Sequence, residues 1–238
     1  MIREHFEVAE SALTLLARKE LVPYGKEAVF RARSSIETAI AEDPYFATSF
    51  EPLWTVSDDR VINRMCSAAI EAGVGPMAAV AGTVAWEAVD AMVAQGATMA
   101  LADNGGDIAL VSDRTVTIGI HTGGPLAGIG FSIPPQDKVM GICSSSADVG
   151  PSISLGRSRI CTVISADVSL ADACATALGN MVQSDDETHL KDCLERILSI
   201  KDVTGAMINA GGHLAMKGDI PRLIKVDDQD ELITRRLL

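Results

Sequence analysis

Aromatic residues are scarce in this sequence, which has five Phe, two Trp and two Tyr among 238 residues. Hydrophobic residues nevertheless make up 47% of the chain. A core built from such a sequence must be aliphatic, and 238 residues are enough for a substantial one. The 20 glycines indicate that backbones approach one another closely.

Basic residues are also in short supply, because 20 Lys and Arg face 32 Asp and Glu and give a net charge of −12. A nucleic-acid partner would require a basic surface, so we expect none. The same charge disfavours binding to an anionic membrane surface. An anionic ligand would need local help from helix N-termini, turn amides or a metal ion.

The sequence has no paired cysteines and no clustered histidines, and we expect no targeting segment. The first thirty residues carry too many charges for a signal peptide, and we expect no membrane-spanning run. The scattered thiols predict neither a disulfide framework nor a zinc site, and they favour a reducing cytoplasm. The cysteines are residues 66, 143, 161, 174 and 193, and the histidines are residues 5, 121, 189 and 213.

Hydrophobic periodicity predicts one α+β domain over residues 1–238, with a largely antiparallel sheet and helices packed on one side. Residues 5–17 fit two short strands around Glu10-Ser11, or one helix. The aromatic-rich residues 44–57 are predicted to form a loop that plugs the core, and residues 122–130 a Gly-rich loop. Helices are predicted over 23–43, 58–72 (capped by Ser57 or Asp58), 76–95, 169–183 and 187–200, and strands over 98–102, 108–111, 115–120, 139–143, 160–165, 204–210 and 222–226.

The stretch Leu101–Leu110 reads Leu-Ala-Asp-Asn-Gly-Gly-Asp-Ile-Ala-Leu and joins two apolar runs. Asn104-Gly105 is a common signal for a β-hairpin turn, and a plain hairpin is one interpretation. In the alternative interpretation, the bare amides of Gly105 and Gly106 and the carboxylate of Asp107 face a ligand. Asn209-Ala-Gly-Gly-His213 faintly resembles this turn. An internal duplication of the sequence is therefore one interpretation.

A second informative stretch is Ala171–Leu178, in which Asp172 and Thr176 lie four residues apart. A helix places both side chains on one face, and a carboxylate with a hydroxyl suits Mg²⁺. The competing interpretation is a capping box, Ser169-x-x-Asp172, in which the carboxylate caps the helix start.

Taken in order, these motifs resemble the ApbE superfamily from about residue 75 to residue 182. The resemblance rests on the Asn104-Gly-Gly-Asp107-Ile turn, an apolar strand, Cys143-Ser-Ser-Ser, and Ala171-Asp-Ala-Cys-Ala-Thr-Ala-Leu. It implies an ApbE-like, T-fold-related fold and an activity that uses FAD and Mg²⁺ to attach FMN to a Thr or Ser of an acceptor protein.

Site residues are carried over by the same resemblance. It implies that Asp172, Thr176 and the main-chain carbonyl of Ala81 hold the metal. It also implies that the flavin nucleotide lies against Thr83 and the turn, whose residues are Asn104, Gly105, Gly106 and Asp107.

The sequence departs from the transferases between the Ser-rich strand and the metal helix. Their His-x-x-Asp-Pro-x-Thr-Gly signature is replaced by Gly150-Pro-Ser-Ile-Ser-Leu-Gly156, and there is neither a secretion signal nor a lipid-anchor cysteine. The chain is more similar to the compact cytoplasmic branch, which is linked to sulfur assimilation and homocysteine formation. An accessory protein that keeps the fold without FMN transfer is therefore the alternative, and a scaffold is the third. We also expect a homo-oligomer, most simply a two-fold dimer.

Overall fold

A computed structural model describes residues 1–8, 11–55, 57–120, 128–146, 156 and 158–226. It contains an eight-stranded sheet in the order β1-β2-β3-β4-β7-β8-β9-β10 and a three-stranded sheet in the order β11-β6-β5. Every strand pair among the described residues is antiparallel. The predicted α+β class with a largely antiparallel sheet is confirmed.

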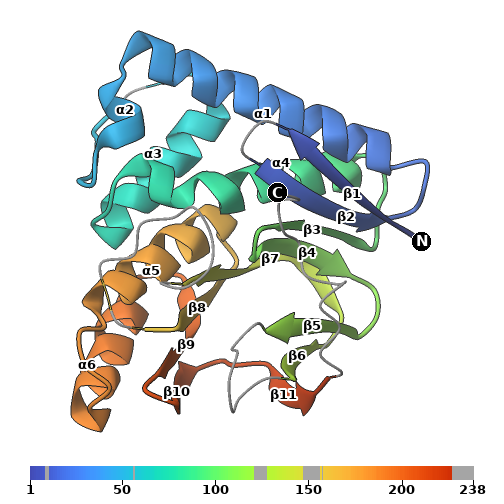
Figure 1. Ribbon diagram of the computed structural model, residues 1–238. Helices are drawn as coiled ribbons and strands as arrows, with labels where there is room; N and C mark the ends of the chain where they lie inside the picture. The colour runs from blue at the N-terminus through green and yellow to red at the C-terminus, as the bar shows by residue number, and fades with distance from the viewer. Residues whose placement is uncertain (9–10, 56, 121–127, 147–155, 157, 227–238) are drawn as a thin grey trace.

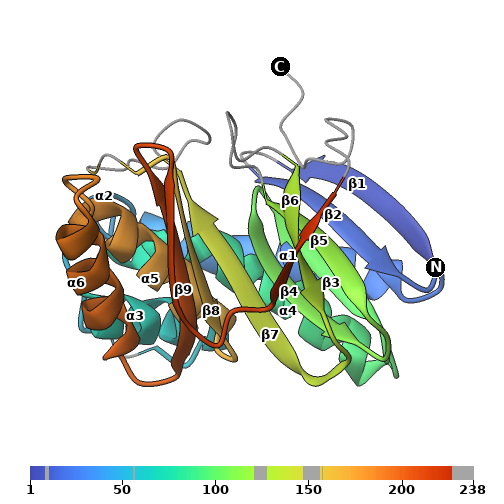
Figure 2. The same ribbon diagram turned by 90° about the horizontal axis from the view of Figure 1, so that it is seen from below.

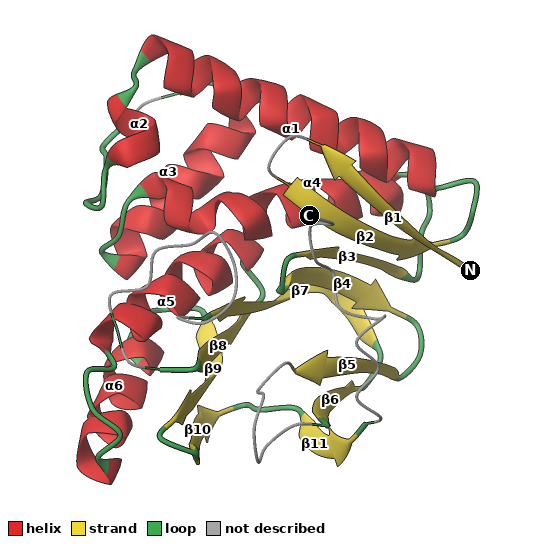
Figure 3. Ribbon diagram, viewed as in Figure 1, coloured by secondary structure: helices red, strands yellow, loops and turns green. Residues whose placement is uncertain are grey.

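The helices cover one face of the large sheet, as Figures 1 and 3 show. They are α1 (Val22–Glu42), α2 (Tyr45–Thr48), α3 (Arg60–Ala72), the 3-10 helix η1 (Pro76–Ala79), α4 (Val80–Ala94), α5 (Val168–Met181) and α6 (Glu187–Leu198). The large sheet contains β1 (Ile2–Val8), β2 (Ser11–Ala17), β3 (Ala100–Asn104), β4 (Asp107–Ser112), β7 (Gln136–Ser145), β8 (Ile160–Ser165), β9 (Val203–Ala210) and β10 (His213–Gly218).

The small sheet consists of β5 (Val116–Ile120), β6 (Ile129–Ile133) and β11 (Arg222–Lys225), and it lies against the other face of the large sheet (Figure 2). Strand β4 shows how both faces are covered. Ala109 and Val111 point into the core beneath the helices, whereas Ile108 and Leu110 join Phe131 of β6 in a second core. The prediction of a sheet with helices on one side therefore omitted this second layer.

Two strands were missing from the sequence prediction. β6 falls partly within residues 122–130, predicted as a loop, because its two-residue alternation is weakened by Gly130. β10 was missed because its side chains are mostly exposed and give little hydrophobic pattern. By contrast, β1 and β2 form the predicted pair of strands, which begins at Ile2 rather than at residue 5, and this rejects the helical alternative.

The same connectivity occurs twice along the chain. Two strands are followed by helices and two more strands in β1–β4, and again in β7–β10. The closing hairpins turn at Gly105-Gly106 and at Gly211-Gly212, and all four glycines have positive φ. The faint sequence echo between these two turns thus corresponds to equivalent positions in two topologically similar halves.

The aromatic-rich segment after α1 does not plug the core as predicted. Phe46 of α2 is buried, with 3% of its surface exposed. Phe50 and Trp54 are 68% and 84% exposed. Phe46 therefore packs inward and Leu53 does so in part, whereas the other aromatic side chains of this segment face solvent.

The segment from Pro76 to Ala94, which includes α4, has the length and apolar composition of a membrane span. This corrects the expectation that no run is long enough. In the fold, α4 contacts α1, α5 and strands β3 and β4. Its apolar character is accounted for by a position in the core between the helices and the sheet.

The N-cap of α3 is Asp59 rather than the predicted Ser57 or Asp58. Its carboxylate accepts hydrogen bonds from the backbone N–H groups of Val61 at 2.7 Å and Ile62 at 3.4 Å. We expect Asp59→Ala to lower the free energy of unfolding by about 1 kcal/mol, the usual contribution of such a cap. The matched variant Asp58→Ala should leave it unchanged in urea denaturation. Equal losses in both variants would contradict this assignment.

Candidate functional site

The Asn-Gly-Gly-Asp stretch forms the tight turn between β3 and β4. Gly105 and Gly106 have φ values of 70° and 107°, which L side chains rarely adopt. A Cβ atom added to either glycine would meet nothing within 4 Å. The Gly106 N–H donates a hydrogen bond to Asp103 Oδ1 at 2.9 Å. The predicted hairpin is present, and its glycine backbone is open to close approach by another group.

Asp107 begins β4 and directs its carboxylate toward the neighbouring strand β7. Its Oδ1 accepts a hydrogen bond from the Ser144 N–H at 3.2 Å. Burial raises the pKa of this carboxyl well above its usual value, and the nearby charge of Asp172 raises it further. The hydrogen bond from Ser144 opposes this shift. Asp107 and Asp172, which are far apart in the sequence, therefore share one environment.

Asp172 lies inside α5 and is 7% exposed. Its Oδ2 accepts a hydrogen bond from the Gly82 N–H in the first turn of α4, at 2.7 Å. Burial raises the pKa of Asp172 to about 7, although hydrogen bonds from the amides of Gly82 and Ala81 lower it. Asp172 is thus a buried carboxylate that faces the N-terminal turn of another helix.

The capping-box interpretation of Ser169-x-x-Asp172 is wrong. The N-cap of α5 is Asp167, whose carboxylate accepts a hydrogen bond from the Leu170 N–H at 2.8 Å. Ser169 is fully buried within the helix, and its hydroxyl lies 2.7 Å from Thr83 Oγ1. Since Asp167 caps the helix, Asp172 is not needed for that purpose.

Small residues at the start of α4 allow this close contact with α5. A Cβ on Gly82 would lie 2.8 Å from Asp172 Cβ and 2.8 Å from the Val168 carbonyl oxygen. The neighbouring Ala81 carbonyl accepts a hydrogen bond from Asn104 Nδ2 at 3.1 Å. The sequence analysis did not single out Gly82, because its contact with α5 is a tertiary feature.

The Thr83 side chain contacts α5 and the preceding helical turn. Its side chain is fully buried, and its hydroxyl donates a hydrogen bond to the Ala79 carbonyl at 2.5 Å. The same oxygen lies within hydrogen-bond distance of Ser169. Thr83 therefore fastens α4 to α5, and the role at the flavin that was predicted for it finds no support in this geometry.

Thr176 follows Asp172 by one turn of α5 and is half-buried. Within the described part of the chain, its hydroxyl takes part in no hydrogen bond. The predicted pairing of a carboxylate and a hydroxyl on one helix face is therefore present, and the hydroxyl remains available to a ligand.

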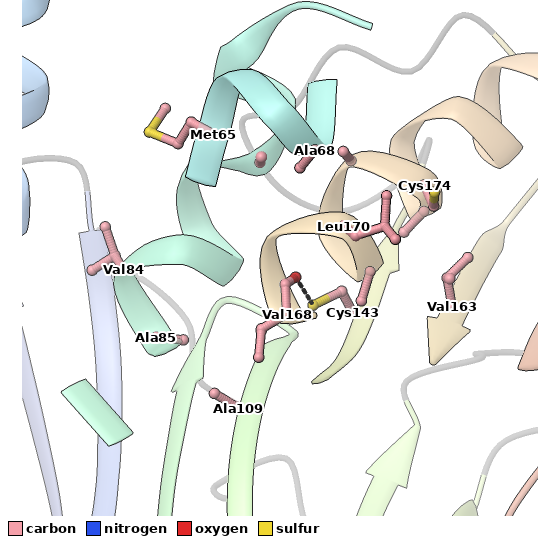
Figure 4. Packing of buried hydrophobic residues seen from close by; sticks show 14 of the residues in the cluster. Met65, Ala68, Val84, Ala85, Ala109, Cys143, Val163, Val168, Leu170 and Cys174 are labelled. Carbon is pink, nitrogen blue, oxygen red and sulfur yellow. Dashed lines mark hydrogen bonds between the residues drawn. The ribbon is translucent and has the colours of Figure 1, made fainter. Parts of the chain in front are cut away.

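Cys143 of β7 lies beneath α5 and was quoted in the sequence motif without a role. Its Sγ is 3.6 Å from the Val168 carbonyl oxygen (Figure 4). Burial raises the pKa of this thiol well above its usual value, and Asp107 and Asp172 raise it further. This environment favours the protonated thiol, and the fully buried Cys143 packs between β7 and α5.

The arrangement combines the buried carboxylate of Asp172, the half-buried carboxylate of Asp107 and an open glycine turn, and the Thr176 hydroxyl lies one helical turn beyond Asp172. Two like charges in a low-dielectric site need a proton or a cation to offset their repulsion. No group of three or more His, Cys, Asp and Glu residues suited to a metal occurs among the described residues. A cation here would therefore draw further oxygens from carbonyl, hydroxyl or phosphate groups, which is typical of Mg²⁺.

Comparisons with known proteins show the family and the fold of this chain. The family model described as AbpE bacteria matches residues 2–196. A UPF0280 protein of Methanocella arvoryzae is 46% identical over 97% of this chain and 94% of its own length. A UPF0280 protein of Methanospirillum hungatei is 43% identical over 98% of this chain and 94% of its own length.

Solved structures with the same fold include the apbe protein from Thermotoga maritima, with a TM-score of 0.55, 11% identity and 99% coverage of both chains. The flavin transferase ApbE from Vibrio cholerae gives a TM-score of 0.50 and 10% identity, covering 91% of this chain and 96% of its own. At such identities, the likeness concerns the fold.

Proposed function

Because this chain belongs to the UPF0280 family and to the family described as AbpE bacteria, we propose that it binds FAD together with Mg²⁺ and transfers FMN to an acceptor protein. The single observation that carries the proposal is the pairing of the half-buried Asp107 with the buried Asp172 beside an open glycine turn. Two facing carboxylates form an unfavourable arrangement in a purely structural core, and a cation between them offsets their repulsion.

The donor set fits a hard cation. Asp172 and Thr176 would supply a carboxylate and a hydroxyl oxygen, and the Ala81 carbonyl a third ligand. Asn104 holds that carbonyl through its side-chain amide, and the Ser144 amide fixes the carboxylate of Asp107. Mg²⁺ bound at such a site supplies positive charge that offsets the charge of a pyrophosphate and of a leaving nucleotide.

The chain's own residues have separate tasks in this proposal. The turn at Gly105 and Gly106 lets a nucleotide approach the main chain without steric hindrance. Transfer joins the hydroxyl oxygen of an acceptor Thr or Ser to the FMN phosphorus, breaks the phosphoanhydride bond to AMP, and releases the hydroxyl proton to a base. None of the eight predicted site residues is assigned as that base.

The alternative function is an accessory protein in sulfur assimilation that keeps the fold without FMN transfer. A specific observation favours it: Gly150-Pro-Ser-Ile-Ser-Leu-Gly156 replaces the His- and Asp-containing signature of the transferases. Most of this tract lies outside the described residues. Incubation with FAD, Mg²⁺ and a candidate acceptor distinguishes the two functions, because only a transferase leaves flavin on the acceptor after denaturation.

Replacement of Thr176 tests the ligand site directly. Mg²⁺ and FAD together should raise the melting temperature of the wild-type protein, because a ligand at a hundredfold excess over its dissociation constant adds about 2.7 kcal/mol. Thr176→Val should melt normally without ligands, since the helix propensities of Thr and Val are similar, and should lose most of the gain. The exposed Thr188 of α6 provides the control variant Thr188→Val. An equal rise in melting temperature for wild type and both variants would show that Thr176 does not contact the ligands.

The oligomeric state belongs to the same proposal. Strands β1 and β10 end the large sheet, and neither has a second neighbour among the described strands. Such edges are commonly covered by another chain, and two-fold dimers are the commonest closed assembly. Light scattering should therefore give twice the mass of one chain, and a monomer mass at micromolar concentration would contradict the dimer.

A cytoplasmic location completes the proposal. All five cysteines are unpaired and buried as free thiols. Free thiols persist in reducing compartments, whereas oxidising ones favour disulfides. The thiol state therefore supports the proposed location in the cytoplasm.

A further inference from the structure

A cavity lies away from the carboxylate pair, between α1, the start of α3 and the C-terminal half of α4. Its volume is about 440 Å³, within the usual range for small-molecule pockets. Four alanines border it together with charged side chains, and two of them, on α4, keep accessible surface whereas the two on α1 are buried. These alanines are Ala28 and Ala32 of α1 and Ala91 and Ala94 of α4.

Three carboxylates beside this cavity already have protein partners. Glu87 is bound by Arg60 and, at 2.7 Å, by Arg64. Asp90 is bound by Arg64 at 2.9 Å. Asp59 caps α3. These groups form the frame of the cavity and are not free to hold a ligand.

Three other polar groups in the cavity lining remain available. Asp58 is exposed and has no partner within the described chain, and the half-buried Ser35 hydroxyl has none there either. Arg31 pairs with Glu27, but both side chains are more than 60% exposed, and a surface pair of this kind contributes little. The cavity therefore offers a cation, a hydroxyl and an anion beside an apolar lining.

We propose that this cavity binds a small aliphatic zwitterion of the amino-acid class. Arg31 and Ser35 receive its carboxylate and Asp58 receives its ammonium group. The accessible methyl groups of Ala91 and Ala94 contact its side chain. A free amino acid and a short peptide share this chemistry. The two opposite charges favour a ligand that carries both, because a singly charged ligand leaves one of them without a partner. This inference does not depend on the binding of flavin.

Calorimetric titration of the full chain at neutral pH tests the proposal with four probes. They are L-leucine, the dipeptide leucyl-leucine, 4-methylpentanoate, which lacks the ammonium group, and 3-methylbutylamine, which lacks the carboxylate. We expect one of the two zwitterions, leucine or the dipeptide, to bind about tenfold more tightly than either singly charged analogue. A preference for leucine over the dipeptide identifies a free amino acid as the ligand class, and the reverse identifies a peptide.

Variants of the two charged residues complete the test. Arg31→Ala and Asp58→Asn should each weaken the binding of the zwitterion by about tenfold. Lys19 and Glu20 are exposed charges outside the cavity, so Lys19→Ala and Glu20→Gln should leave the binding unchanged. All four variants should keep the wild-type melting temperature and its response to FAD with Mg²⁺, which separates this proposal from the previous one. The proposal is overturned if no zwitterion binds at millimolar concentration, if the analogues bind equally well, or if the cavity variants bind like the wild type.

Discussion

Replacing Asp172 by Asn is expected to stabilise the protein at pH 8 in buffer without divalent cations. The buried carboxyl has a pKa near 7, so at pH 8 it is charged beside Asp107 and poorly solvated. Asn has nearly the same shape, and its carbonyl oxygen can still accept the hydrogen bond from the Gly82 N–H. One pKa unit corresponds to about 1.4 kcal/mol, and we expect a gain of about 2 kcal/mol.

The pH dependence has a definite sign. The folded pKa of Asp172 lies above the unfolded value of 3.8, so the folded state binds the proton more tightly between these two values. The contribution of this proton is complete at low pH and is lost as the pH rises through about 7. The free energy of unfolding measured in urea from pH 5 to pH 8 should therefore fall more steeply in wild type than in Asp172→Asn.

The exposed Asp58 provides the control for this prediction. Asp58→Asn removes one carboxylate from the surface and should leave the slope of stability against pH unchanged. Asp172→Asn should also abolish the stabilisation by Mg²⁺ and FAD, because the amide is a poor ligand for a hard cation. If Asp172→Asn were less stable than wild type at pH 8, the carboxylate would contribute to folding. It would then not be a group whose burial lowers stability for the sake of ligand binding.

The second large effect is expected for Gly82→Ala. A helix interior normally favours Ala over Gly by about 1 kcal/mol. Here the new methyl group would lie 2.8 Å from the Val168 carbonyl oxygen and from Asp172 Cβ, so α4 and α5 must move apart. Overpacking of this kind costs about 1–3 kcal/mol, and we expect a net loss of about 2 kcal/mol in urea denaturation.

Gly119→Ala is the matched control for this effect. Gly119 is an exposed residue of β5, and nothing lies within 4 Å of a Cβ at that position. Its replacement should be neutral or slightly stabilising, because Gly weakens a strand. If Gly82→Ala were as stable as wild type and still gained stability from Mg²⁺ and FAD, the close contact between α4 and α5 would not be required for the site.

Features that depend on local sequence were predicted well. The Asn104-Gly105 turn and the helix after Pro23 follow from backbone preferences within a few residues. The spacing of Asp172 and Thr176 places them on one helix face, whatever the rest of the chain does. The eight predicted site residues include the two carboxylates that the fold brings together, although the pattern did not show that they would meet.

Tertiary structure decided the roles that depend on distant partners. Asp172 reaches Gly82 across 90 residues of sequence, and Ser169 reaches Thr83 across 86. The contact with Gly82 shows that Asp172 is a buried acceptor and not the helix cap. The contact with Ser169 shows that the Thr83 hydroxyl links α4 to α5. The small sheet was likewise beyond local reasoning, because an apolar strand pattern does not identify the layer that covers it. Local sequence thus determined the turns and helix faces, whereas packing determined which polar groups lost their water and faced one another.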